Sequence, residues 1–231
     1  MDTSRYIRLG GLAGLLFAVV WLVCAVAYLT QVGVPATMPT LAESAQLLRS
    51  PAYGYILTAR FVAILFIIPF ALAGRDCLVG LAPGRARTGA TFLFLYATLW
   101  FVWHATMVAS LGVAKVDPID EPTLSIFLTL VGTLASAMSW AIALFEAAWG
   151  AALVGRKGLE QVAGASFLLG AGAAVIILIM PDSSPGQLEQ IMSQVSTLFM
   201  IVGVGSLGLS MFRGASSPVK GDVPATQRQM A

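Results

Sequence analysis

Six long apolar segments run through this chain of 231 residues, and they constrain its fold more than any other feature. Each exceeds the ~18 residues that distinguish a membrane span from a buried core helix. Only 10% of the residues are charged, against about 25% in a typical soluble domain. Lipid offers the backbone no hydrogen-bond partners, so each segment must form a helix. We predict an all-α bundle of six transmembrane helices, with spans at about 9–33, 53–74, 88–113, 124–154, 161–180 and 187–212.

The charges between these segments alternate in sign from one connection to the next. One set of connections holds ten of the thirteen basic residues, namely Arg5, Arg8, Arg75, Arg85, Arg87, Arg156, Lys157, Arg213, Lys220 and Arg228. The other set is mainly acidic and contains Glu43, Asp117, Asp120, Glu121, Asp182 and Glu189. Because Lys and Arg favour cytoplasmic loops, we predict that both termini are cytoplasmic and that the protein lies in a bacterial inner membrane.

Two segments outside the spans have a recognisable character. The external connection at about 34–52 contains Thr40-Leu41-Ala42-Glu43, a capping-box pattern that predicts a short amphipathic helix at the outer membrane surface. The tail at 214–231 is polar and rich in Gly, Ser and Pro, so we predict that it is disordered. The six-helix transmembrane domain therefore occupies 1–213.

Small residues recur at helical spacing within several spans. Such ladders allow helix backbones to approach closely in lipid. The positions that we expect to pack are Gly10, Gly14, Ser139, Ala143, Ala147 and Gly170. The ladder in span 124–154 is the longest, which predicts that this helix is the central one. Packing within one chain is the favoured interpretation, and a dimer face is the alternative.

Three ionisable side chains remain inside the apolar segments: Arg60, His104 and Glu146. Helices rise about 1.5 Å per residue, which allows their depths to be compared. Arg60 and His104 fall in the outer half of the membrane, whereas Glu146 falls in the inner half. The three groups are therefore not expected to form one compact site.

Each of the three residues has a structural and a functional interpretation. Arg60 either extends its charge to the outer interface or contacts an anion in a cavity. Glu146 is either a protonated, hydrogen-bonded contact between helices or a site for a proton or cation. His104, one turn from Trp100, is either a neutral hydrogen-bonded imidazole or the axial ligand of a haem or a chlorophyll-type pigment.

Catalytic and metal-binding patterns are largely missing from the sequence. A single His excludes centres with several His ligands, and the chain has no serine elbow, no glycine-rich phosphate loop and no Asp within a span. We therefore predict no catalytic residues, no metal site and no cofactor, with a tetrapyrrole at His104 as the exception. The net charge of +2 indicates no binding to nucleic acid.

These observations leave three functional hypotheses. The first is a non-catalytic accessory or structural subunit, with the lipid bilayer and other membrane subunits or a second copy as partners. The second is a small transporter or sensor that binds an ion or polar ligand through Glu146 with Arg60 and His104. The third is pigment binding through His104.

The chain also resembles a known family in its layout. The relevant features are the basic lead-in with Arg5 and Arg8, the short external helix, and the early Arg in Thr58-Ala59-Arg60-Phe61. Together they resemble a family of uncharacterised bacterial six-helix membrane proteins, described only as a domain of unknown function. The resemblance covers the whole chain at the level of topology. It implies the six-helix fold and assigns no activity or site residue.

Overall fold

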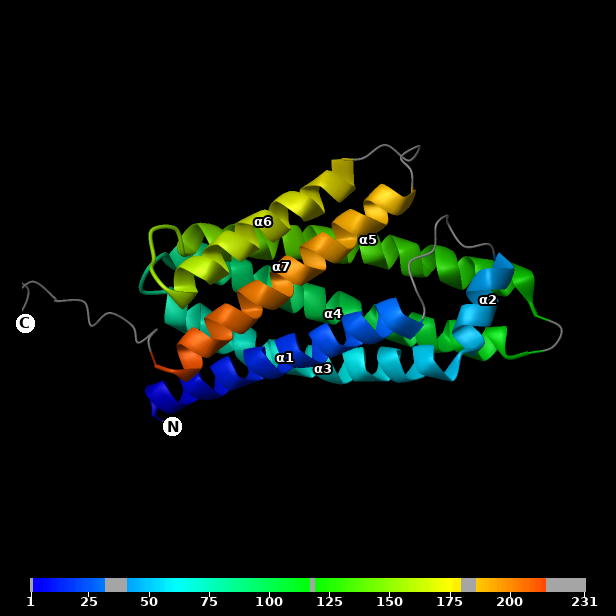
Figure 1. The fold of residues 1–231 in the computed structure, drawn as a ribbon, viewed down its shortest axis with the longest axis horizontal. Helices are drawn as coiled ribbons and strands as arrows, with labels where there is room; N and C mark the ends of the chain where they lie inside the picture. The colour runs from blue at the N-terminus through cyan, green and yellow to red at the C-terminus, as the bar shows by residue number, and fades with distance from the viewer. Residues whose placement is uncertain (1, 32–40, 117–118, 180–185, 215–231) are drawn as a thin grey trace, which may run out of the picture.

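The computed structural model describes residues 2–31, 41–116, 119–179 and 186–214, with the side chains of 186–190 excepted. Over these ranges the protein consists of seven helices and no strand (Figure 1). They are α1 (Thr3–Gln31), α2 (Leu41–Arg49), α3 (Pro51–Leu78), α4 (Pro83–Ala114), α5 (Glu121–Ala152), α6 (Leu159–Ile179) and α7 (Gly186–Phe212). All except α2 are long and apolar enough to cross a membrane, which confirms the all-α prediction with six spans.

Several helices begin before the apolar segments that predict them, because residues that favour a helix start precede these segments. Pro51 and Pro83 occupy first-turn positions, where a missing N–H costs no helical hydrogen bond. Asp120 caps α5 and accepts hydrogen bonds from Thr123 Oγ1 at 2.6 Å and Thr123 N at 3.2 Å. These two bonds hold the pKa of the Asp120 carboxyl below its ordinary value.

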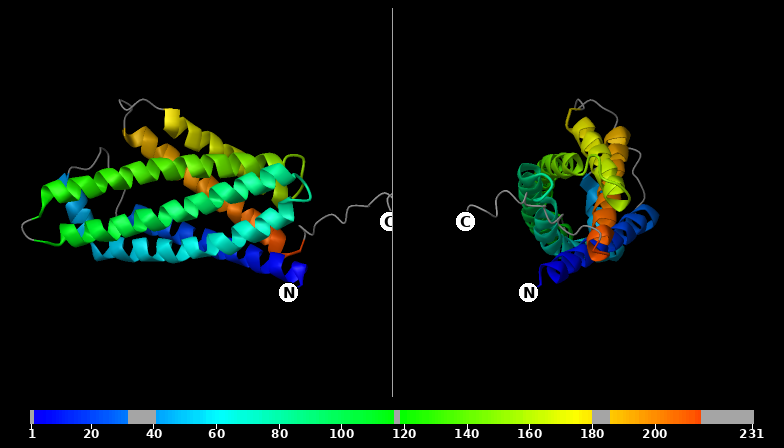
Figure 2. Two further views of the ribbon diagram at one scale, coloured as in Figure 1. Left: turned by 180° about the vertical axis from the view of Figure 1, so that it is seen from behind. Right: turned by 90° about the vertical axis from the view of Figure 1, so that its left-hand side faces the viewer.

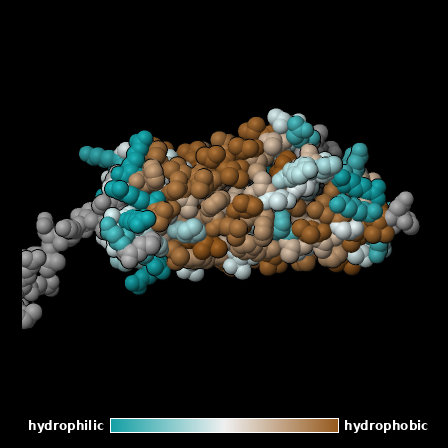
Figure 3. All heavy atoms as spheres, turned by 90° about the horizontal axis from the view of Figure 1, so that it is seen from below, coloured by the Kyte–Doolittle hydropathy of each residue, from teal (hydrophilic) through white to brown (hydrophobic). Residues whose placement is uncertain are grey.

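The six long helices form an elongated bundle, and the first and last described residues lie at the same end of it (Figures 1 and 2). The tight connections at 79–82 and 153–158 lie at this end too, and α2 lies at the opposite end. Hydrophobic side chains form a belt between two hydrophilic ends (Figure 3). The tail prediction from residue 215 onward, and Thr40 of the predicted capping box, fall outside the described residues.

The core of the half that contains the termini is built around Trp149 of α5. Its buried ring meets Phe70, Phe145 and Phe167 edge to face, at centroid distances of 5.6, 5.1 and 6.4 Å. Its Nε1 donates a hydrogen bond of 3.1 Å to the carbonyl oxygen of Ala86. These partners belong to α3, α4, α5 and α6, so one side chain joins four helices. We call these five residues the Trp149 cluster.

Helix α1 packs on two neighbours through glycine. Gly10 and Gly14 face α3, where an added Cβ would collide with the side chains of Ala73 and Phe70 respectively. Gly11 faces α7, where an added Cβ would lie 2.5 Å from the carbonyl oxygen of Gly208. From this close approach α1 and α7 diverge toward the end of the bundle that carries α2 (Figure 1).

Helix α5 is not the central helix, so that prediction is wrong. Only 17% of its most apolar stretch is buried, against 33–50% in the other five long helices. One reason is length: α5 has 32 residues and α6 has 21, so the first turns of α5 extend past the end of α6 (Figure 1). The small-residue ladder does not stay on one face either. Ala143 is buried, Ser139 is half-buried and Ala147 is exposed, because each i+4 step turns about 40° around the helix.

Close packing against Trp149 predicts that Gly89→Ala destabilises the protein. A Cβ at Gly89 would overlap the Trp149 ring, so we expect a loss of about 1–3 kcal/mol and a lower melting temperature in detergent. Gly112, in the same helix, has no atom within 4 Å of its added Cβ and provides the control. Gly112→Ala should leave the melting temperature unchanged or slightly raise it. Equal melting temperatures for the two variants would contradict this packing.

Candidate functional site

Arg60 of α3 turns its side chain toward α1. Its guanidinium carbon lies 5.7 Å from the ring centroid of Trp21 and 5.5 Å from that of Tyr28, both within the range of cation–π attraction. Its Nε atom is buried and has no hydrogen-bond acceptor in the described part of the chain. The two ion pairs formed within these ranges are Arg75–Asp76 and Arg156–Glu160, so neither involves Arg60. Among the described residues, the charge therefore rests on aromatic faces and forms no ion pair with a carboxylate.

The aromatic segment of α4 continues this arrangement. The Trp100 ring stacks on Trp103 at 4.8 Å and meets Trp21 at 4.9 Å. His104 stacks on Phe61, the neighbour of Arg60, at a centroid distance of 4.3 Å. The Nε1 atoms of Trp100 and Trp103 and the Nδ1 atom of His104 are buried without a hydrogen-bond partner among the described residues.

Arg60, Trp100, Trp103 and His104 thus form a set of buried nitrogen atoms with no acceptor, which we call the donor cluster. The sequence pointed to three of these residues and missed Trp103, together with the α1 aromatics Trp21 and Tyr28. Trp21 and Tyr28 are seven residues apart and share a helix face, which is a usable signal. Which neighbour this face meets depends on helix packing, which no local pattern encodes.

Glu146 of α5 occupies a different environment. It is 0% exposed, and neither carboxyl oxygen has a hydrogen-bond partner within the described ranges. Both oxygens lie 2.6 Å from the position that a Cβ on Gly170 would take, so the carboxyl group rests against the bare backbone of α6. Any larger residue at position 170 would displace it.

A second buried carboxyl group, that of Glu160, differs from Glu146 because it has bonding partners. Glu160 is 7% exposed, and one oxygen accepts a hydrogen bond of 2.5 Å from Arg156 Nε. The Ser210 hydroxyl donates to the other oxygen at 3.4 Å. Glu160 lies one residue before the predicted span at 161–180. The pairing makes Glu160 a link between α6, α7 and the preceding loop.

Glu146 and the donor cluster are two separate sites. No hydrogen bond, ion pair or ring contact between described residues joins Glu146 to Arg60 or His104. Tyr96 of α4 is 2% exposed and lies within electrostatic range of both Arg60 and Glu146.

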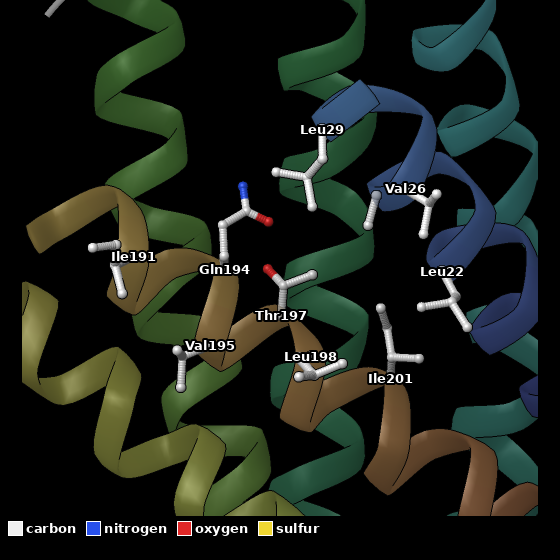
Figure 4. Close-up of a pocket in the computed structure, with 10 residues that line it drawn as sticks. Leu22, Val26, Leu29, Ile191, Gln194, Val195, Thr197, Leu198 and Ile201 are labelled. Atoms are coloured by element: carbon white, nitrogen blue, oxygen red, sulfur yellow. The ribbon is translucent and has the colours of Figure 1, made fainter. Parts of the chain in front are cut away.

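A groove of about 390 Å³ opens where α1 and α7 diverge (Figure 4). Its lining is apolar apart from Gln194 and Thr197, both on α7. The apolar residues along it are Leu22, Ala25, Val26 and Leu29 of α1, and Ile191, Val195, Leu198 and Ile201 of α7. Leu22 and Leu29 directly follow Trp21 and Tyr28, so the groove and the Arg60 contacts lie at the same level of α1.

No family model, curated protein or solved structure matches this chain.

The pigment hypothesis for His104 stays a prediction, and a visible absorption spectrum tests it. We expect the purified protein to be colourless, because Nδ1 of His104, one of the two ring nitrogen atoms that could coordinate a metal, is enclosed by the protein. His104→Ala serves as the comparison. A visible band that is present in the wild type and lost in this variant would establish His104 as a pigment ligand and overturn the expectation.

Proposed function

We propose that this protein is a small membrane transporter or sensor in which the carboxyl group of Glu146 takes up and releases a proton. The observation that carries the proposal is the complete burial of this carboxyl group without a hydrogen-bond partner in the described residues. Acidic residues within membrane spans are costly and are typical of proton relays and substrate pathways.

The two buried carboxyl groups, Glu146 and Glu160, differ in their surroundings. An ionised carboxylate in a low-dielectric interior needs a cation or several donors beside it. Glu160 has Arg156 and Ser210, whereas the Glu146 carboxyl group rests against the backbone of Gly170 and has no hydrogen-bond partner in the described residues. Glu146 is therefore stable there as the neutral acid. It can ionise when the contact between α5 and α6 opens and water reaches it.

The membrane orientation belongs to this proposal. The basic residues Arg75, Arg85 and Arg156 lie in or beside connections at the end of the bundle that carries the termini (Figure 1). Positive charge favours the cytoplasmic face, which supports cytoplasmic termini in a bacterial inner membrane and, with them, an outer position for α2. Glu146, near the end of α5, would then exchange protons with the cytoplasmic side.

A hydrophobic carbodiimide tests this proposal, since such reagents add covalently to protonated carboxyl groups in apolar surroundings. We expect one adduct per chain, on Glu146, by intact-mass and peptide analysis of protein in lipid nanodiscs. Labelling should fall as the pH rises, because the reagent requires the protonated acid. Glu160 is an internal control, and its ion pair with Arg156 should protect it.

Variants separate proton exchange from a packing role. Glu146→Gln should remove the adduct and leave the melting temperature close to that of the wild type, since no hydrogen bond is lost. Gly170→Ala should change the labelling rate, whereas Gly172→Ala, whose added Cβ meets nothing within 4 Å, should not. A folded wild type that is unlabelled at Glu146 at every pH would contradict the proposal and leave Glu146 a static contact.

A different observation supports an accessory-subunit role as a second candidate. The half of α5 near Glu121 is largely exposed, and Ser125, Thr129 and Thr133 line a shallow depression of about 330 Å³. The hydroxyl groups of Thr129 and Thr133 bond to carbonyl oxygens four residues earlier on their own helix. Small and hydroxyl-bearing residues are typical of contacts between transmembrane helices, so this face suits a helix of another subunit.

Gentle detergent extraction tests the accessory role. We expect a stoichiometric partner or a second copy to remain bound to the wild type, and Thr133→Leu to weaken that association. Thr98→Leu is the matched control, because Thr98 is an exposed α4 residue whose hydroxyl makes the same kind of bond. Recovery of the wild type as a single isolated chain would count against this role.

A further inference from the structure

We propose that the donor cluster binds the carboxylate group of an amphiphile, with Arg60 as its counter-ion and the indole N–H groups of Trp100 and Trp103 as further donors. The inference names a ligand class for the proposed transporter or sensor, and it rests on that function only in assuming that the chain binds a ligand. The site is distinct from Glu146.

The nitrogen atoms without a partner require a ligand that accepts hydrogen bonds. Arg Nε and indole Nε1 can only donate hydrogen bonds, so three members of the cluster share the same requirement. A buried donor without an acceptor is destabilising, so three in one region are unfavourable unless a ligand accepts their hydrogen bonds. His104 adds a nitrogen atom of either character, because its tautomer depends on what it contacts.

The positive charge of Arg60 favours a negatively charged group as the acceptor. The guanidinium group lies between two aromatic faces, and no acidic side chain in the described ranges forms an ion pair with it. Arginine pairs with carboxylates through two parallel hydrogen bonds, a geometry that a carboxylate matches directly. The aromatic rings around it exclude water, which strengthens such a pair.

The surroundings indicate that the rest of the ligand is apolar. Trp21 and Tyr28 lie against the Arg60 guanidinium and Phe61 lies against the His104 ring, so the part of a ligand next to its carboxylate would meet apolar aromatic surfaces. The groove between α1 and α7 supplies an apolar surface (Figure 4), which lies at the level of Trp21 and Tyr28. In the proposed complex a fatty-acid-like molecule would place its carboxylate at Arg60 and its chain along this groove.

Quenching of tryptophan fluorescence tests this inference in nanodiscs of zwitterionic lipid. The probe is a fatty acid that carries a nitroxide near its carboxyl end, used at a pH at which the acid is ionised. Its methyl ester provides an uncharged probe of nearly the same shape. A Trp140→Phe background removes the indole that is 51% exposed and leaves three of the remaining four tryptophans at the site.

We expect the acid to quench with an apparent affinity roughly tenfold higher than that of the ester, as one charge-assisted hydrogen bond would give. Arg60→Gln should lower the apparent affinity for the acid to that for the ester. Arg87→Gln, an exposed residue of α4 outside this cluster, should leave the difference intact. Equal quenching by acid and ester in the wild type would overturn the inference.

Trp103→Phe separates ligand binding from a structural role. It also provides a second test if the Arg60→Gln variant is unstable. The indole N–H of Trp103 has no partner among the described residues, so its removal breaks no hydrogen bond within the protein. We expect weaker binding of the acid with an unchanged melting temperature. Unchanged binding would remove Trp103 from the site. Glu146→Gln should bind the acid like the wild type, so failure of the proton proposal and failure of this inference remain distinguishable.

Discussion

The edge-to-face contacts of Trp149 hold together the half of the bundle on which the other features depend. Lipid supplies little hydrophobic driving force between helices, so packing and interhelical hydrogen bonds must stabilise the bundle. Trp149 supplies both, through Phe70, Phe145 and Phe167 and through its bond to the Ala86 carbonyl. The glycines beside it make room for the indole, and Glu146 lies three residues before it on the same helix.

The same cluster explains why Glu146 is so deeply buried. Glu146 follows Phe145 and precedes Trp149 by three residues, so two anchors of α5 fix its direction toward α6. Gly170 then allows the backbone of α6 to approach the carboxyl group. Toward the other end, α1 and α7 diverge and aromatic side chains surround Arg60. Over the described ranges, the protein therefore has a tightly packed half with an acid that has no hydrogen-bond partner, and a more open half with buried donors that have none.

The sequence was sufficient to predict the helices, since apolar length and flanking charge act locally. It also found Arg60, His104 and Glu146, because ionisable residues are conspicuous in apolar spans. It could not predict that Trp21 and Tyr28 face Arg60, which depends on the rotation of α1 against α3. It also misplaced α5 as the central helix, because small residues permit close packing without specifying a neighbour. The burial of Glu160 likewise required knowledge of where α6 begins.

The central claim is that Glu146 exchanges a proton within the bundle, and infrared spectroscopy observes that group directly. The C=O stretch of a protonated, buried carboxyl group can be followed in membranes as the pH is changed. The account predicts a band in the wild type that loses intensity as the pH rises and that Glu146→Gln lacks. A band that stays constant over the whole pH range in which the protein is folded, or one that persists in Glu146→Gln, would contradict it.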